Sequence, residues 1–171
     1  MRLPILSLLA VLLTLQSGCS DPKGNEMLKV EQSEGVIVND VGDGRFPTPT
    51  GWTPNRSGGN TAVILTRVDA NPQGREEMIS IDIGTPKSPD VKASADGFAG
   101  KFSGSVTPLP FAVDGEQAYR ISIPANYEQL MPRECIVVHH AGKVCFLIGG
   151  SKSKVDIWPT LEEIAESWTW K

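Results

Sequence analysis

The hydrophobic and polar positions along the chain predict a domain in which β-strands outnumber helices. Apolar runs of strand length, several of them alternating with polar residues, occur at 35–38, 61–69, 78–83, 118–123, 135–140 and 143–148. Turn-forming residues at 71–74 predict that strands 61–69 and 78–83 form an antiparallel hairpin. Ala141 and Gly142 separate the last two runs, so we expect a second hairpin with a two-residue turn, ended by Gly149 and Gly150.

Two further segments have the spacing of helices. Ser88 and Pro89 suit an N-cap and a first helical position. Apolar residues then recur at helical spacing at Val91, Ala95, Phe98 and Phe102. Near the end of the chain Thr160 and Glu163 form a capping box. The docking face of this helix consists of Leu161, Ile164, Ala165 and Trp168.

The order of these elements predicts the fold class. Strands and helices do not alternate regularly, as a parallel sheet requires. We therefore expect a single α+β domain at 35–171, with a central antiparallel β-sheet and helices packed on its faces. A composition of 40% hydrophobic and 21% charged residues fits one globular domain.

The first 18 residues are typical of a lipoprotein signal peptide. Arg2 supplies a positive start, and the apolar stretch 3–15 is too short to span a bilayer. It leads into Leu15-Gln16-Ser17-Gly18-Cys19, which resembles a lipobox with Gln16 where Leu is usual. We expect residues 1–18 to be removed and Cys19 to carry lipid, with ordinary cleavage after Ser20 as the alternative.

This reading predicts where the protein works. Residues 19–34 comprise the lipidated Cys19 and a mostly polar segment with Pro22 and Gly24, which we interpret as a flexible tether. The domain would be lipid-anchored at a membrane of the cell envelope and face the periplasm, and Ser20 favours the outer membrane. A formal net charge of −4 without a dense basic cluster argues against nucleic acid as a partner.

The two remaining cysteines, Cys135 and Cys145, pose the question of a disulfide in an exported protein. With a two-residue turn, His140 pairs with Lys143, so that Cys145 faces Val138 and Cys135 faces Ile148. The sulfurs then lie on opposite sides of the sheet, and a bridge needs a β-bulge. Otherwise each thiol is a small buried hydrophobic group.

The only histidines, His139 and His140, are neighbours on one strand and so point to opposite faces. They cannot bind one metal together without a bulge. The sequence has no H-E-x-x-H, G-x-S-x-G or phosphate-loop motif, so we expect no metal, no cofactor and no catalytic residues. The tryptophans line a groove or close the core, and Trp170, which falls off the helix stripe, is the one expected to be exposed.

Several segments are similar to those of a known family. Phe46-Pro47 with Gly51-Trp52 looks like an entry motif, the segment 113–118 like a strand lead-in, and 142–147 and 166–168 like a hairpin arm and a closing helix. Through these segments, residues 45–171 resemble the PsbP/DcrB-like family, which includes a photosystem II extrinsic subunit and bacterial envelope lipoproteins. The resemblance implies a Mog/PsbP-like fold and a non-enzymatic assembly or binding role, and it does not imply a photosynthetic function.

These observations favour a lipid-anchored envelope domain, not an enzyme, with a non-catalytic role in binding an envelope protein or supporting its assembly. Two alternatives remain. One is a small-ligand-binding protein with a groove beside the sheet. The other is an envelope enzyme that uses His139, His140 or the cysteines of the same hairpin.

Overall fold

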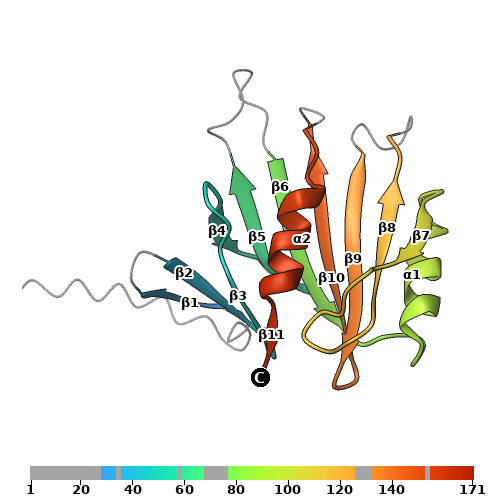
Figure 1. Cartoon of the computed structure of the whole chain (residues 1–171), viewed down its shortest axis with the longest axis horizontal. Helices are drawn as coiled ribbons and strands as arrows, with labels where there is room; N and C mark the ends of the chain where they lie inside the picture. Colours follow the sequence, from blue (N-terminus) through green and yellow to red (C-terminus); the bar gives the residue numbers. More distant parts are fainter. Residues whose placement is uncertain (1–27, 34–35, 58, 68–76, 126–131, 153–154) are drawn as a thin grey trace, which may run out of the picture.

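A seven-stranded antiparallel sheet forms the centre of the protein (Figure 1). The computed structural model describes residues 28–33, 36–57, 59–67, 77–125, 132–152 and 155–171, so the signal peptide and Cys19 lie outside the described residues. Listed in spatial order, the strands are β4 (Thr53–Arg56), β5 (Thr61–Arg67), β6 (Glu77–Gly84), β10 (Lys143–Ser151), β9 (Arg133–His140), β8 (Ala118–Ile123) and β7 (Ser105–Pro108). The predicted α+β class, the antiparallel pairing of β5 with β6 and the β9–β10 hairpin are confirmed. The turn predicted at 71–74 lies outside the described residues.

A second, four-stranded sheet lies beside the first. It consists of β1 (Leu28–Ser33), β2 (Val36–Val41), β3 (Gly44–Pro47) and β11 (Thr169–Trp170). The prediction of a flexible tether through residue 34 is therefore wrong for 28–33, which pair in antiparallel register with β2. Leu28 and Val30 alternate with polar residues, which is the strand pattern that the polar composition of the segment obscured.

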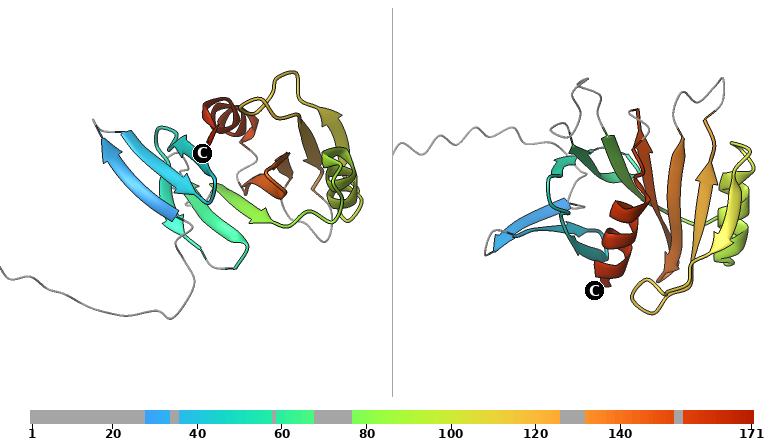
Figure 2. Two further views of the ribbon diagram at one scale, coloured as in Figure 1. Left: turned by 90° about the horizontal axis from the view of Figure 1, so that it is seen from below. Right: turned by 45° about the horizontal axis from the view of Figure 1, so that its top comes forward.

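The two helices pack against different faces of the main sheet, and each face has its own core. α2 (Trp158–Ser167) covers one core with Leu161, Ile164 and Ala165, all fully buried, followed by Trp168. α1 (Val91–Ala99) covers the other with Ala95 and Ala99. Figure 2 shows the two helices well apart, on different sides of the sheet. The predicted docking face of the closing helix is confirmed.

Both predicted N-caps are wrong, although the helices exist. Asp90, two residues after Ser88, caps α1, and its Oδ1 accepts a hydrogen bond from the backbone N–H of Lys92 at 2.9 Å. α2 begins at Trp158, whose N–H donates to Asp156 Oδ1 at 3.0 Å, so the capping box at Thr160 is not used. Several polar residues precede each helix, and the packing of the chain on the sheet selects among them.

The β9–β10 hairpin has the register expected from the sequence. His140 pairs with Lys143, and Cys135 pairs with Ile148. The predicted break at Gly149 is wrong, because β10 continues through both glycines to Ser151. A Cβ on Gly149 would lie 3.0 Å from Ile157 and 3.1 Å from Leu161, so this glycine lets the beginning of α2 approach the strand closely.

The turn of this hairpin contains a strained alanine. Ala141 and Gly142 have φ values of 47° and 75°, as a type I′ turn requires. A left-handed alanine costs about 1–2 kcal/mol, whereas asparagine tolerates this conformation. We expect Ala141→Asn to raise the free energy of unfolding by about 0.5–1 kcal/mol, measured by urea denaturation. Ala141→Val, a β-branched residue at the same position, should lower it, and equal stabilities for the two variants would contradict this account.

Candidate functional site

A groove with a volume of about 560 Å³ runs beside α1. We call it the α1 groove. It is lined by Asp82 and Gly84 of β6, by Ser94, Gly97 and Phe98 of α1, and by Phe146 of β10. Sites for small molecules in proteins have volumes of about 300–1,000 Å³. The groove is therefore large enough to hold a ligand.

The groove exists because α1 covers only part of its face of the sheet. The helix packs on β7, β8 and β9, while β6 lies beyond β10. Gly84 and Gly97 add no side chains to the space, and a Cβ built on either would have no neighbour within 4 Å. Gly97 costs the helix about 1 kcal/mol relative to alanine. Gly97 therefore keeps this side of the groove free of side chains, although it lowers the stability of α1.

The apolar part of the groove is formed by two phenylalanines. Phe98 and Phe146 are half-buried, and their ring centroids lie 5.0 Å apart. Both rings also pack against the core under α1, which holds them in place. The groove therefore offers a fixed aromatic surface to an apolar group.

The polar part contains a carboxylate with an unused acceptor. Asp82 Oδ1 is buried and has no hydrogen-bond partner among the described residues. Burial raises the pKa of Asp82, and a side-chain hydrogen bond with Thr61 opposes this shift. The exposed Lys87 and Lys101 also line the groove and have no ion pair within the described part of the chain. Charges of both signs therefore surround the apolar surface.

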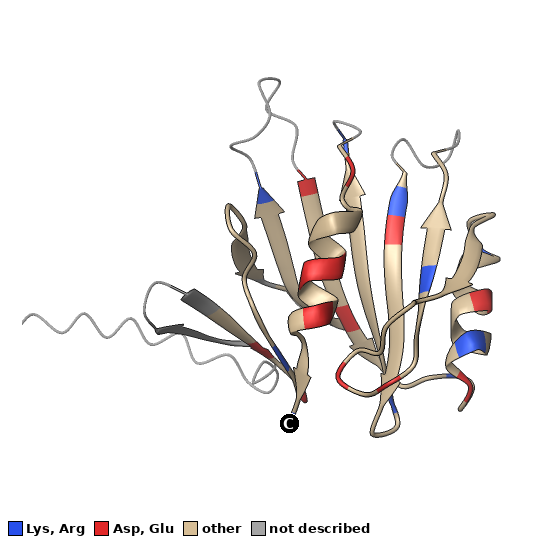
Figure 3. Ribbon diagram, viewed as in Figure 1, with Lys and Arg blue, Asp and Glu red and all other residues tan. Residues whose placement is uncertain are grey.

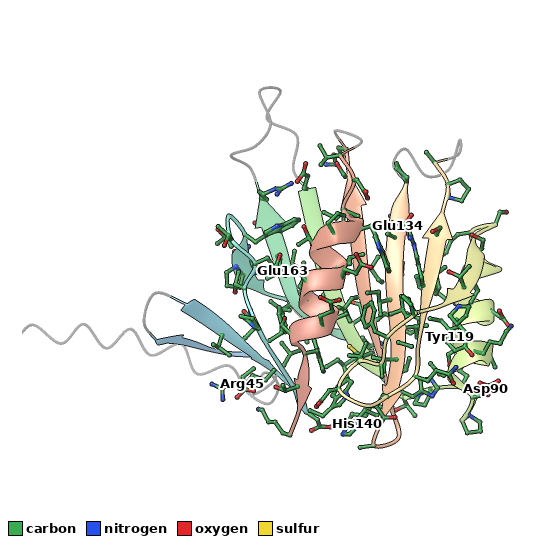
Figure 4. All side chains as sticks on the ribbon, in the orientation of Figure 1. Arg45, Asp90, Tyr119, Glu134, His140 and Glu163 are labelled. Carbon is green, nitrogen blue, oxygen red and sulfur yellow. The ribbon has the colours of Figure 1, made fainter. Side chains whose placement is uncertain are left out.

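The structure separates the two histidines, as the strand geometry predicts. His139 Nε2 lies 3.0 Å from Ser94 Oγ on the α1 side. His140 Nδ1 lies 3.0 Å from Glu116 Oε1 on the other side and its ring stacks on Trp170 at 4.5 Å; Figure 4 shows His140 at the lower end of β9. The described residues include no group of three or more side chains placed to hold a metal ion.

The two cysteines are free and lie in different cores. Cys135 belongs to the core under α1 and Cys145 to the core under α2, so the possible disulfide between them is not formed. Burial raises the pKa of the Cys135 thiol to about 12 and also raises the pKa of Cys145. Because the thiolate is the nucleophilic form, neither cysteine suits catalysis at neutral pH.

The expectation of an exposed Trp170 is wrong. The chain leaves α2 as the short strand β11, and Trp170 is half-buried there. Its backbone N–H donates to Asp114 Oδ2 at 2.7 Å, and its Nε1 donates to the carbonyl of Val113 at 3.2 Å. None of the four tryptophans lines the α1 groove.

The residues that line the groove were not predicted from the sequence, although two of them have features that are visible there. Asp82 falls on the polar side of the alternating strand 78–83, which indicates an accessible face without naming a site. Gly97 lies inside the predicted helix but off its apolar stripe, at a position where glycine costs the helix about 1 kcal/mol relative to alanine. Their proximity depends on where α1 lies, which the pattern does not specify.

Asp82 is expected to lower the stability of the folded chain at neutral pH. Because burial raises its pKa above the ordinary 3.8, the folded state holds the proton more tightly than the unfolded state. Stability therefore falls as pH rises from the unfolded pKa through the raised folded pKa. We expect Asp82→Asn to raise the free energy of unfolding at pH 7 by on the order of 0.5 kcal/mol, a small gain because the residue is only half-buried.

Urea denaturation as a function of pH checks this expectation. Well below pH 3.8 the carboxyl is protonated in both states, so the stability difference between the wild-type chain and the Asn variant should stop changing with pH. A stability difference that grows toward low pH would contradict the assignment.

Fold and groove together define a small α+β domain with a ligand-sized site beside an antiparallel sheet. The chain is similar to the solution structure of cyanobacterial PsbP (CyanoP) from Synechocystis sp. PCC 6803, with 14% identity, 91% of this chain and 99% of that chain covered, and a TM-score of 0.46. A likeness at this level assigns no site or function to this chain.

No protein-family model and no curated protein matches the sequence. Among the described residues, no helix is long and apolar enough to cross a membrane. The function therefore has to be argued from the chain's own side chains.

Proposed function

We propose that this protein is a non-catalytic binding domain of the cell envelope, held at a membrane by lipid on Cys19, with the α1 groove as its recognition site. The observation that carries this proposal is the groove itself, with a volume of about 560 Å³, a fixed aromatic surface and a buried acceptor without a partner. Pockets of this size with few, placed polar groups are the usual form of a small-molecule site.

The surface of the described residues favours binding of a small ligand over an extended interface with another protein. Met78 and Val155 are its only exposed large hydrophobic residues, at 37% and 45% exposure. Interfaces between proteins usually present larger apolar patches. Figure 3 shows acidic and basic positions distributed among strands and helices. The groove, by contrast, is concave and apolar, so it is the feature that favours the ligand-binding alternative.

The fluorescent probe 1-anilinonaphthalene-8-sulfonate tests whether the groove binds apolar molecules. Gly97→Leu places a side chain in open space inside the groove, whereas Lys92→Leu places the same side chain on the exposed outer side of α1. We expect the full chain and Lys92→Leu to bind the probe with similar affinity and Gly97→Leu to bind it at least tenfold more weakly. Equal binding by all three chains would exclude the groove as the site.

The lipid anchor needs its own experiment. Metabolic labelling with tagged palmitate should label the full chain and place it in the membrane fraction. Cys19→Ser should abolish the label although Cys135 and Cys145 remain. An unlabelled, soluble wild-type product would contradict the anchor and leave the groove experiment unaffected.

One contact of a residue that lines the groove has the geometry of a catalytic pair, and it can be tested separately. Ser94 Oγ and His139 Nε2, 3.0 Å apart, have the spacing of a nucleophile and its base. Within the described residues, however, no carboxylate bonds to His139 and orients it. We expect p-nitrophenyl acetate to be hydrolysed equally by the full chain and Ser94→Ala. A Ser94-dependent rate would overturn the non-catalytic proposal.

A further inference from the structure

The α1 groove presents three kinds of chemistry at once, and a ligand has to satisfy all of them. Phe98 and Phe146 provide a fixed apolar surface. Asp82 lines the groove with a carboxyl group, whose Oδ1 has no hydrogen-bond partner among the described residues. Lys87 and Lys101 contribute positive charge from the loop before α1 and from the residues just after it.

A positively charged hydrogen-bond donor would be the most favourable partner for the Asp82 carboxylate. A buried acceptor without a hydrogen bond destabilises the folded chain, and a charged donor offsets this effect more than a neutral donor does. Thr61 already bonds with the carboxyl, so the site needs a group that supplies an additional donor. An ammonium group, with three N–H donors, meets this requirement.

The two lysines restrict the ligand further. A ligand with only a positive charge would be attracted by Asp82 and repelled by Lys87 and Lys101. Since both lysines are exposed and have no ion pair within the described residues, an anionic group on the ligand can pair with either of them. A ligand that carries both charges can pair its cation with Asp82 and its anion with a lysine.

We propose that the α1 groove binds the zwitterion of an apolar α-amino acid or short apolar peptide, with its ammonium on Asp82, its carboxylate at Lys87 or Lys101, and its apolar side chain against Phe98 and Phe146. This inference rests on the proposed function, because it names the ligand class of the same groove. The volume of about 560 Å³ suits either source of this chemistry.

Three probes separate the charges of the ligand. L-Phenylalanine carries both charges, 2-phenylethylamine only the ammonium, and 3-phenylpropionate only the carboxylate. The full chain is titrated at pH 7 with each probe, and binding is measured by calorimetry and by the NMR amide shifts of Gly84 and Gly97. Phenylalanine should shift these two amides and bind at least tenfold more tightly than either analogue. The dipeptide Phe-Phe is the fourth probe. Tighter binding of the dipeptide identifies a peptide ligand, tighter binding of phenylalanine a free amino acid, and both results support the ligand class.

Matched variants assign each charge to its partner. Asp82→Asn is expected to fold at least as stably as the natural chain. It should weaken the binding of phenylalanine and 2-phenylethylamine about ten- to a hundredfold and should not weaken the binding of 3-phenylpropionate. The double variant Lys87→Met with Lys101→Met should weaken phenylalanine and 3-phenylpropionate instead. Lys92→Met, on the outer side of α1, should leave all three affinities unchanged.

The outcomes distinguish the ligand class from the function of the groove. If phenylalanine binds no better than its analogues, or if Asp82→Asn leaves its affinity unchanged, the amino-acid inference is wrong. The groove stays a binding site in that case as long as Gly97→Leu weakens the apolar probe. If Gly97→Leu affects neither that probe nor phenylalanine, the proposed function fails together with the inference.

Discussion

Gly44→Ala is expected to lower the free energy of unfolding by about 3 kcal/mol, the upper range for overpacking a core. A Cβ at this position would lie 2.0 Å from Cζ2 and 2.5 Å from Cε2 of Trp168. The indole cannot move aside, because it is 1% exposed and stacks on Phe46 with ring centroids 5.2 Å apart. The glycine cannot move either, since β3 pairs with β2 and β11 there. Urea denaturation measures the loss.

Gly84→Ala is the matched control for this substitution. Gly84 also lies at the end of a strand, but a Cβ there would have no neighbour within 4 Å. We expect a change below about 0.5 kcal/mol for this variant, as for substitutions at open positions. Equal losses for the two alanine variants would show that strand glycines, rather than contact with Trp168, determine the effect.

The sequence predicted best those elements that depend on neighbours along the chain. The β9–β10 register follows from the two-residue turn at Ala141 and Gly142, and from it follow the opposite faces of Cys135 and Cys145. The docking face of α2 follows from helical spacing alone. In each case the repeat of the helix or strand, together with a nearby turn or apolar stripe, determines which side chains face the core.

Short strands whose partners are distant in sequence were missed. β4 and β7 contain four residues each, with Pro54 and Pro108 among them, and proline is a poor indicator of a strand. β11 contains two residues and pairs with β3, which lies more than a hundred residues earlier. Edge strands of this kind are stabilised by an existing sheet rather than by their own pattern.

The candidate site was missed for a related reason. The α1 groove is a space, and its existence depends on how far α1 extends across the sheet. Asp82 and Phe98 are distant from Phe146 in sequence, and no local pattern joins them. The absence of catalytic motifs and the separation of His139 from His140 were open to sequence reasoning because both are local properties. A groove assembled from three elements was not open to it.

The second large effect is expected at a buried ion pair between β5 and β6. Glu77 is 1% exposed, and its Oε2 accepts a hydrogen bond from Arg67 Nε at 2.7 Å. The guanidinium also lies 5.1 Å from the ring centroid of Trp52. Arg67→Met keeps the apolar length of the side chain and removes the guanidinium that donates to the buried carboxylate of Glu77. We expect the free energy of unfolding to fall by about 3 kcal/mol, measured by urea denaturation at pH 7.

A second arginine–glutamate pair in the same sheet provides the control. Arg120 Nε lies 2.9 Å from Glu134 Oε2, and its guanidinium lies 3.9 Å from the ring centroid of Trp158, so the geometry is similar. The Arg120 and Glu134 side chains are 34% and 22% exposed, however, so water can solvate a carboxylate that has lost its partner. Arg120→Met should therefore cost only about 1 kcal/mol. Equal losses at the two positions would mean that burial of Glu77 contributes nothing to the effect. Arg67→Met combined with Glu77→Gln should recover part of the loss if the buried charge of Glu77 causes it.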